Sequence, residues 1–259
     1  MELTTRFTGR DPADPSRQVV MTAPATIDPS RTALVICDMW DRHWCRAAER
    51  RVAEVAPAIN RLAANLRQRG ALIAHAPSDT LSGYLDHPAR RNAIAASVAR
   101  PQRTLGWKGH DPGREGPLPV DDSDGGCPCT PRCADGRPWR GQISAIEIYG
   151  GDVLTDSAEI YSVYADRGVD TVLFTGVHTN MCVLGRPFGI RRSVELDYRV
   201  LLVRDLTDTM YNPSRRPWVD HFTGTDIVVQ HIETWWCSSV TSDQIVGGEP
   251  FRFAEDSRT

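Results

Sequence analysis

The stretch TVLFTGVHTNMCVLGR, from Thr171 to Arg186, decides the fold and indicates where the chemistry lies. Its first residues, 171–175, are apolar or β-branched, which is typical of a buried strand. Gly176 ends that run, and residue types that favour turns and helix N-termini follow it. Apolar residues at helical spacing then come after Cys182. We therefore predict that Cys182 lies where a buried strand gives way to a helix.

A thiol in that position suits nucleophilic chemistry. The start of a helix offers the positive end of the helix dipole and unpaired N–H groups, and both favour a thiolate. The same N–H groups could bind an oxyanion that forms when the thiolate attacks a carbonyl. The alternative is that Cys182 is a small buried side chain that only packs.

Strand and helix patterns alternate around this stretch. Strands are predicted at Thr32–Cys37, 71–76, 143–148, 171–175, 199–203 and 226–231. Helices are predicted at 50–69 and within 156–167, and they end at Gly70 and Gly168. The pattern predicts one α/β domain over residues 1–259, with a mostly parallel six-stranded sheet, helices on both faces and an extended N-terminal arm at 1–30.

Three polar positions follow the ends of predicted strands. Asp38 comes after the first strand, His75 is at the end of the second, and the segment from His178 to Cys182 follows the fourth. Ligand sites of open parallel sheets lie beyond the carboxyl ends of the strands. We therefore expect these residues to converge, which favours the catalytic interpretation of Cys182.

Composition excludes several functions. The formal net charge of −3 gives no electrostatic case for nucleic-acid binding, and no apolar run is long enough to span a membrane. The polar N-terminus lacks the apolar core of a secretory signal. An odd number of cysteines, seven, fits a reduced, cytoplasmic protein. No glycine-rich dinucleotide or phosphate loop and no G-x-S-x-G occurs, so no catalytic cofactor is predicted.

Residues 106–142 form a Gly-, Pro- and Asp-rich insertion between the second and third predicted strands. An irregular segment of this length is often a functional lid or a disordered loop. It carries Cys127, Cys129 and Cys133, whose thiols could bind a structural zinc, pair with one another or remain free. No fourth ligand lies at a standard spacing.

ALVICDMW, which contains Asp38, together with the later LFTGVHTNMCV resembles the isochorismatase-like cysteine hydrolases, a superfamily that includes nicotinamidases and N-carbamoylsarcosine amidohydrolases. The similarity covers roughly residues 30–245 apart from the insertion and implies a Rossmann-like sheet. It implies that Asp38 is the base and Cys182 the nucleophile that forms an acyl-enzyme. It also implies a cis peptide before His178, so that the N–H groups of His178 and Cys182 form the oxyanion hole.

The sequence departs from this superfamily at the third catalytic residue. A lysine normally follows the third strand, but this region reads AIEIYGGDVLTD. Lys108, the only lysine, could reach in from the insertion, Glu147 could fill the space, or the chemistry could differ. Both are therefore candidate catalytic residues.

Other residues around the expected site are candidates for contact with substrate, namely Trp40, His43 and His75. Trp40 stands where the superfamily often has an amide side chain two positions after the aspartate. The metal-binding string D-x-x-H of nicotinamidases is absent, and a comparable site would have to be assembled from Asp41, His43 and His75. We predict no catalytic metal.

The resemblance and the residues together predict a hydrolase that cleaves a non-peptide C–N bond of a small amide or ureide through a thioester. It also implies a homodimer or homotetramer. Two alternatives stay open: a vinyl-ether hydrolase, although those relatives lack the cysteine, and a catalytically inactive binding or scaffold protein, which the missing lysine would explain.

Overall fold

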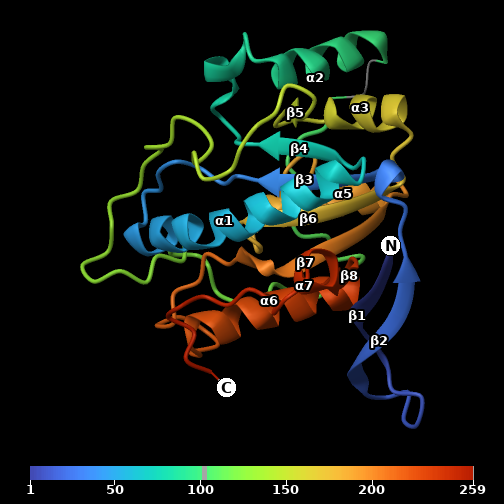
Figure 1. Ribbon diagram of the computed structural model, residues 1–259. Coiled ribbons are helices and arrows are strands. Elements are labelled where there is room, and N and C mark those ends of the chain that lie inside the picture. The colour runs from blue at the N-terminus through green and yellow to red at the C-terminus, as the bar shows by residue number, and fades with distance from the viewer. Residues whose placement is uncertain (101–103, 259) are drawn as a thin grey trace.

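The computed structural model describes residues 1–100 and 104–258 and contains one eight-stranded sheet (Figure 1). The strands run in the spatial order β2-β1-β8-β7-β6-β3-β4-β5. Their bounds are β1 (Glu2–Arg10), β2 (Gln18–Thr26), β3 (Thr32–Cys37), β4 (Leu72–Ala76), β5 (Val153–Leu154), β6 (Thr171–Val177), β7 (Arg199–Asp208) and β8 (Ser238–Val240).

Six strands, from β8 to β5, are parallel, as the alternating pattern predicts. The expected N-terminal arm is instead an antiparallel hairpin of β1 and β2, and β1 joins the sheet beside β8 at Arg6 and Ser239. The sheet therefore has two strands more than the six predicted, and the two are those of this hairpin. Exposed and less exposed residues alternate along β2, as expected of an edge strand with one face in solvent.

The helices are α1 (Arg46–Gln68), α2 (Pro88–Ala99), α3 (Ile160–Arg167), α4 (Cys182–Gly185), α5 (Ile190–Glu195), α6 (His221–Trp235) and α7 (Asp243–Val246). Short 3-10 turns lie at Pro29–Arg31 and Leu81–Tyr84. None of the described helices is both long enough and apolar enough to cross a membrane.

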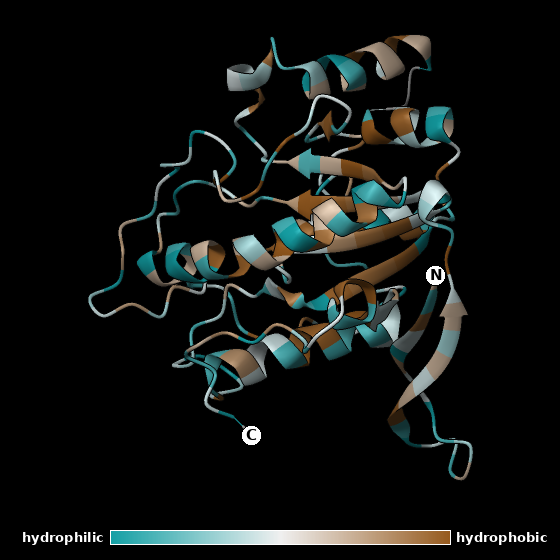
Figure 2. Cartoon of the chain, viewed as in Figure 1, coloured by the Kyte–Doolittle hydropathy of each residue, from teal (hydrophilic) through white to brown (hydrophobic). Residues whose placement is uncertain are grey.

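Helices cover both faces of the sheet, as predicted. Along β3, Ala33, Val35 and Cys37 pack into one hydrophobic cluster with residues of α3, α5 and α6. Leu34 and Ile36 point to the opposite face, into a second cluster with α1 and α7. This alternation follows from the two-residue period of a strand. In Figure 2 the hydrophobic colour concentrates on the central strands between these layers.

The strand predicted at 143–148 is wrong, because this segment is a loop. The Ile143 N–H donates to the Met39 carbonyl, and the Ile146 N–H turns back to the Ile143 carbonyl. The buried side chain of Ile146 packs on the α1 face of the sheet, which explains the apolar pattern without a strand. The strand beside β4 is the two-residue β5.

The strand predicted at 226–231 is also wrong, because these residues lie within α6. Asp220 caps this helix, its carboxylate accepting from the N–H groups of Phe222 and Thr223. Val228, Val229 and Ile232 share one buried face, which is helical spacing in a β-branched run. The last parallel strand is therefore the short β8 that follows.

The insertion at 106–142 contains no helix or strand among its described residues and makes one isolated bridge, from Gln142 to Trp40. In Figure 1 it runs along the end of the sheet toward which the arrowheads of β3 and β4 point. Gly126 fixes part of this path: its φ is +69°, and a Cβ there would lie 2.3 Å from the Met210 carbonyl oxygen. The insertion therefore lies near the sheet edge where the site was expected.

Candidate active site

Asp38 is fully buried directly after β3. Its backbone is left-handed, with φ 47°. One carboxylate oxygen accepts the Ser78 N–H at 2.9 Å, and the other accepts the Nε–H of Arg186 at 3.1 Å. Burial raises the pKa of Asp38, although the Arg186 cation opposes that rise. The result is a carboxylate that is a stronger base than an exposed aspartate.

Gly176 lets the end of β6 lie against the end of β3. Its φ is +93°, and a Cβ there would lie 2.1 Å from the Cys37 carbonyl oxygen, so no other residue fits. The expected cis peptide is present between Val177 and His178. The chain then turns into α4, which begins at Cys182. This path places the half-buried thiol of Cys182 beside the Asp38 carboxylate.

Cys182 is held as a thiol in this structure rather than as the free thiolate that its place at a helix start suggests. Burial raises its pKa well above that of an ordinary thiol, the Asp38 charge adds to the rise, and Arg186 acts in the opposite direction. The helix α4 has only four residues, so its dipole is too small to outweigh these effects.

Arg186 places a cation beside Asp38, where the resemblance implied a lysine. It stands four residues after Cys182, at the end of α4, and its guanidinium also lies 3.8 Å from the Asp79 carboxylate. Burial would lower its pKa, but Asp38 and Cys182 more than compensate, so it remains protonated. Arg186 could have been identified from the sequence, because it ends the stretch 171–186 that contains Cys182. One helical turn separates it from the cysteine.

Neither residue proposed for the lysine's place is paired with Asp38. The ammonium of Lys108 binds Glu195 at 2.6 Å and Asp111 at 3.2 Å. Glu147 is exposed, and its carboxylate accepts the Tyr149 hydroxyl at 2.9 Å. The expectation that one of them replaces the lysine is corrected by the geometry: the buried partner of the aspartate is Arg186.

The N–H groups of His178 and Cys182 remain candidates for an oxyanion hole. The neighbouring Met181 and Val183 N–H groups both donate to the His178 carbonyl. Within the described part of the chain, the N–H groups of His178 and Cys182 themselves meet no backbone or side-chain acceptor. Donors left unpaired beside a nucleophile suit an oxygen that gains negative charge.

Trp40 lies beneath the insertion and contacts its C-terminal part. It is buried, its indole N–H donates to the Ser78 carbonyl at 3.0 Å, and its ring stacks on Trp139 at 4.3 Å between centroids and 11° between planes. The ring of Trp107, in the insertion, packs against Gly185, where a Cβ would lie 2.5 Å from it. Both tryptophans that flank the insertion therefore dock it on the elements that carry Asp38 and Cys182.

His43 and His178 join through their ring nitrogens, and the hydrogen bonds fix their tautomers. The Cys45 N–H donates to His43 Nδ1 at 3.0 Å, so the proton of a neutral His43 is on Nε2. That Nε2–H donates to His178 Nε2 at 3.2 Å, which leaves the His178 proton on Nδ1, facing the Asp208 carboxylate at 3.9 Å. Burial lowers the pKa of His43 to about 4, so both rings stay neutral near pH 7.

Asp208 anchors this pair of histidines from β7. Its buried carboxylate binds Arg51 at 2.9 Å and His221 at 2.8 Å. Burial would raise the pKa of Asp208, but Arg51 and His221 outweigh it and keep the carboxylate ionised. Nothing local in the sequence signals this network, because Arg51, Asp208 and His221 come from α1, β7 and α6 and share no spacing.

His75 does not face the candidate site. Its side chain points to the α1 face of the sheet, as the alternation along β4 requires, and both ring nitrogens are bonded. Nδ1 meets the Gln142 amide oxygen at 3.0 Å, and Nε2 meets Asp152 at 3.1 Å. The prediction that His75 contacts substrate is therefore corrected to a structural role. A metal site from Asp41, His43 and His75 is not assembled either: among the described residues, the group of three potential ligands within 4.8 Å of one another is Cys45, Cys127 and Cys129.

The cysteines of the insertion lie together, as their spacing suggested, and a further residue joins them. Cys45, at the start of α1, has its sulfur 3.9 Å from that of Cys129. Cys127 and Cys133 lie in the same buried cluster. The fourth thiol was not identified from spacing because 82 residues, 127 minus 45, separate it from the nearest member of the trio.

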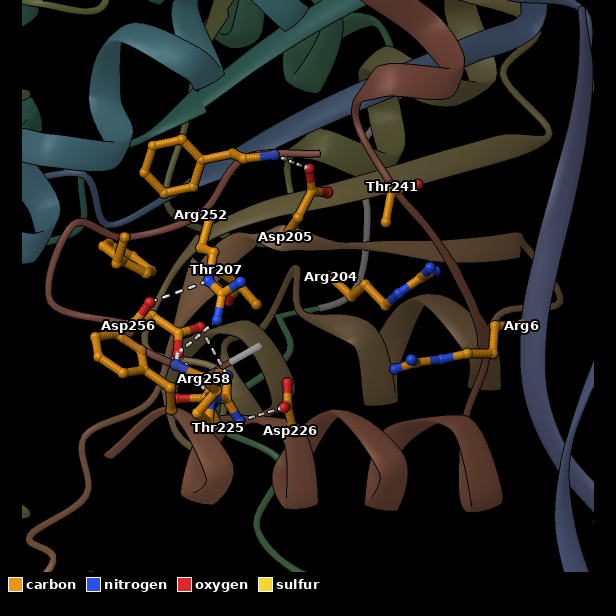
Figure 3. A pocket seen from close by; sticks show the side chains of 13 residues that line it. Arg6, Arg204, Asp205, Thr207, Thr225, Asp226, Thr241, Arg252, Asp256 and Arg258 are labelled. Atoms are coloured by element: carbon orange, nitrogen blue, oxygen red, sulfur yellow. Dashed lines mark hydrogen bonds and ion pairs between the residues drawn. The ribbon is translucent and has the colours of Figure 1, made fainter. Parts of the chain in front are cut away.

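A separate cleft lies between β7, α6 and the C-terminal segment (Figure 3). Its arginines are largely neutralised: Arg258 binds Asp226 at 2.7 Å and Asp256 at 2.8 Å, and Arg6 binds Glu233 at 2.8 Å. Its lining includes neither Asp38 nor Cys182. The catalytic candidates are therefore not in this cleft.

Solved structures with this arrangement of strands and helices cover most of the chain. A cysteine hydrolase from Pseudomonas syringae pv. phaseolicola 1448A is similar with a TM-score of 0.54 and 18% sequence identity, over 85% of this chain and 92% of that one. An isochorismatase from Pseudomonas putida KT2440 is similar with a TM-score of 0.51 and 12% identity, over 85% of this chain and 93% of that one. The chain has the isochorismatase-like fold. No protein-family model and no curated protein matches this sequence.

Proposed function

We propose that this protein is a cysteine-dependent hydrolase that cleaves a non-peptide C–N bond in a small amide or ureide. The observation that carries the proposal is the buried group of Asp38, Cys182 and Arg186 at the carboxyl edge of the parallel sheet. It holds a nucleophile, a base and a cation, and unpaired N–H groups stand beside the nucleophile. Fold alone would not support an activity, so the proposal rests on this site.

In the first half of the proposed reaction, the Cys182 sulfur attacks the substrate carbonyl carbon while its proton passes to Asp38. The oxygen of the tetrahedral intermediate takes up negative charge and accepts hydrogen bonds from the N–H groups of His178 and Cys182. Asp38 then returns the proton to the substrate nitrogen, the C–N bond breaks, and ammonia or an amine leaves. The acyl group stays on the sulfur as a thioester.

In the second half, water attacks the thioester carbonyl and gives a proton to Asp38. Collapse of the intermediate breaks the C–S bond, releases the carboxylic acid or carbamate, and returns the proton to the sulfur. Throughout the cycle, Arg186 keeps a positive charge 3.1 Å from the carboxylate that accepts and donates the proton. The site therefore starts and ends the cycle with the same protons.

We propose that the insertion shields the reacting groups from water. Trp139 stacks on Trp40 next to the Asp38 strand end, and Trp107 packs on Gly185 of α4. A covered site strengthens the electrostatic interactions within it and protects a thioester from premature hydrolysis. Trp40 and His43 are then placed to line the space that a substrate occupies.

A covalent adduct on Cys182 is the test of this function. The protein is incubated with a panel of small amides and ureides, quenched in acid, and examined by intact-mass and peptide mass spectrometry. We expect a mass increase equal to the acyl group on Cys182, with ammonia or amine release in the same mixtures. Cys182→Ala should show neither, with an unchanged circular dichroism spectrum.

The matched control is Cys237→Ser, which removes a thiol at the end of α6 and should leave turnover unchanged. Normal turnover by Cys182→Ala would refute the covalent mechanism. The binding-protein alternative predicts tight binding without release of product. The presence of Arg186 beside Asp38 weighs against it, because the missing lysine was the reason for that alternative.

A further inference from the structure

Four cysteines from two distant parts of the chain meet beside the start of α1. Cys127, Cys129 and Cys133 belong to the insertion, and Cys45 immediately precedes α1. The sulfurs of Cys45, Cys127 and Cys129 all lie within 4.8 Å of one another. The sulfur of Cys133 is not within this distance of all three, but Cys133 lies in the same buried cluster, beside Cys127 and Cys129. Three of the four side chains are buried and Cys129 is half-buried.

The separation of the sulfurs of Cys45, Cys127 and Cys129 suits one tetrahedral ion. With metal–sulfur bonds of about 2.3 Å, the sulfurs of a tetrahedral zinc site stand about 3.8 Å apart. Cys45 and Cys129 are 3.9 Å apart. An iron–sulfur cluster with two or more irons divides its cysteines among those irons, so three of its thiolates would not all lie within 4.8 Å of one another as these three sulfurs do. The spacing therefore favours a single ion.

Backbone N–H groups point at these sulfurs. The Arg46 N–H donates to Cys133 Sγ at 3.5 Å, and the Ala48 N–H faces Cys45 Sγ, so the first turn of α1 serves two of the four thiols. The N–H groups of Cys129 and Cys133 face Cys127 Sγ. Thiolates bound to a metal carry negative charge and are stabilised by such donors, which also orient them. A thiol that only packs needs none of them.

Four ionised thiols at this site would need a cation to balance their charge. The four sulfurs can ionise together only if a cation lies between them, because like charges at this distance repel. Arg132, over the Trp44 ring, is mostly exposed, and its guanidinium is already paired with Asp135 at 2.7 Å.

We propose that Cys45, Cys127, Cys129 and Cys133 bind one structural zinc ion. Four thiolates in a tetrahedron are the ligand set of structural zinc sites, which leave no position open for substrate. The ion would tie the insertion to the start of α1 and would give it the rigidity that an irregular segment of this length lacks.

The same ion would also hold a wall of the candidate active site. The Cys45 N–H donates to His43 Nδ1, and His43 Nε2 meets His178. A fixed Cys45 therefore fixes the position and the tautomer of His43. This consequence depends on the position of His43 and not on the proposed hydrolase activity, so a metal measurement tests the zinc site whatever the activity is.

The experiment begins with protein produced in zinc-supplemented medium and purified under reducing conditions. Elemental analysis should find about one zinc per chain. X-ray absorption at the zinc edge should show four sulfurs at about 2.3 Å. Replacement by Co²⁺ should give the intense visible bands of a tetrahedral cobalt thiolate. These three measurements use the parent protein and need no variant that folds poorly.

Variants then assign the ligands. Cys45→Ser and Cys133→Ser should each lower the zinc content of purified protein at least tenfold after dialysis against a chelator. The matched control is Cys237→Ser, whose thiol lies near β8 and should retain one zinc. Full zinc retention by Cys45→Ser would overturn the four-thiol site.

Other outcomes would also overturn the proposal. They are nitrogen or oxygen ligands in the absorption spectrum, iron with inorganic sulfide, disulfides among these cysteines in protein alkylated without reduction, or reduced protein that binds neither zinc nor cobalt. None of these results depends on whether Cys182 forms an acyl-enzyme.

Discussion

Removal of the Arg186 charge is the most direct test of how this site is built. Its Nε lies 3.1 Å from Asp38 Oδ2 in a buried environment. For charge centres about 4 Å apart and an effective dielectric constant of about 20, the attraction is about 4 kcal/mol. Since about 1.4 kcal/mol corresponds to a factor of ten, a change confined to the transition state could cost up to about 10³ in rate. Water that enters the space left by the guanidinium will replace part of the lost electrostatic stabilisation.

We therefore expect Arg186→Gln to lower kcat/KM by about 10² or more. Arg186→Lys keeps the charge and should retain more activity than Arg186→Gln, although it loses the planar fork of donors. Arg192→Gln is the matched control, because Arg192 lies on α5 in a half-exposed pair with Glu195. Such a pair contributes about 0–1 kcal/mol, so its loss should leave the rate unchanged.

A second assay needs no substrate. Iodoacetamide reacts with the thiolate, and the pKa of Cys182 is raised by burial and by Asp38, with Arg186 opposing the rise. In the parent, alkylation of Cys182 should therefore increase only above pH of about 8.5, the value of a free thiol. In Arg186→Gln the pKa rises further, so alkylation at any fixed pH below this should be slower. If Arg186→Gln kept kcat/KM within about threefold of the parent and labelled at the same pH, the assigned role of Arg186 would be refuted.

Three further outcomes are expected. Asp38→Asn keeps the shape but cannot accept the thiol proton, so kcat should fall by about 10² or more in the ammonia-release assay, and an unchanged kcat would remove Asp38 as the base. His43 has a folded pKa of about 4 against 6.5 unfolded, so its contribution to stability is complete above pH 6.5 and is lost as the pH falls toward 4. Urea titrations should show this loss as about 3 kcal/mol, and His43→Asn should flatten the slope; an equal slope in the variant would contradict it. Trp139→Ala removes a stacking contact of about 1 kcal/mol and should speed tryptic cleavage after Arg140, whereas the exposed Trp218→Ala should not; equal cleavage rates would show that the stack does not hold the insertion down.

The insertion is also anchored by a buried charge that limits how it can be tested. Glu115 accepts hydrogen bonds from Arg191, His231 and the Trp236 indole, all at 3.0 Å or less. A deletion of 113–136 would leave Arg191 buried without its partner, which typically costs several kcal/mol. The single substitution at Trp139 is therefore the cleaner test of a lid.

The sequence by itself determined the parallel sheet and the meeting of Asp38 with Cys182. Local pattern suffices for these features, because a strand buried on both faces reads as a continuous apolar run and parallel strands deliver their carboxyl ends to one edge. The glycine after the strand was visible as a break. The reason for a glycine there, its close approach to the Cys37 carbonyl, depends on how β3 and β6 pair in space.

Only the tertiary structure distinguished strand from helix where apolar periodicity was ambiguous. The run at 226–231 is β-branched and could be either, and it is a helix because its apolar face fills the layer beside α3 and α5. The segment at 143–148 has apolar residues that pack as a loop, which a periodic pattern does not separate from a strand.

Tertiary structure alone also selected the partners of the reactive groups. Arg186 rather than Lys108 or Glu147 neutralises Asp38, and Cys45 rather than a residue of the insertion completes the group of four thiols. Charge pairing and metal geometry are decided by distances of a few ångströms in space. Spacing along the chain fixes such distances only within one element, so a contact between segments as far apart as residues 45 and 129 has no local signal.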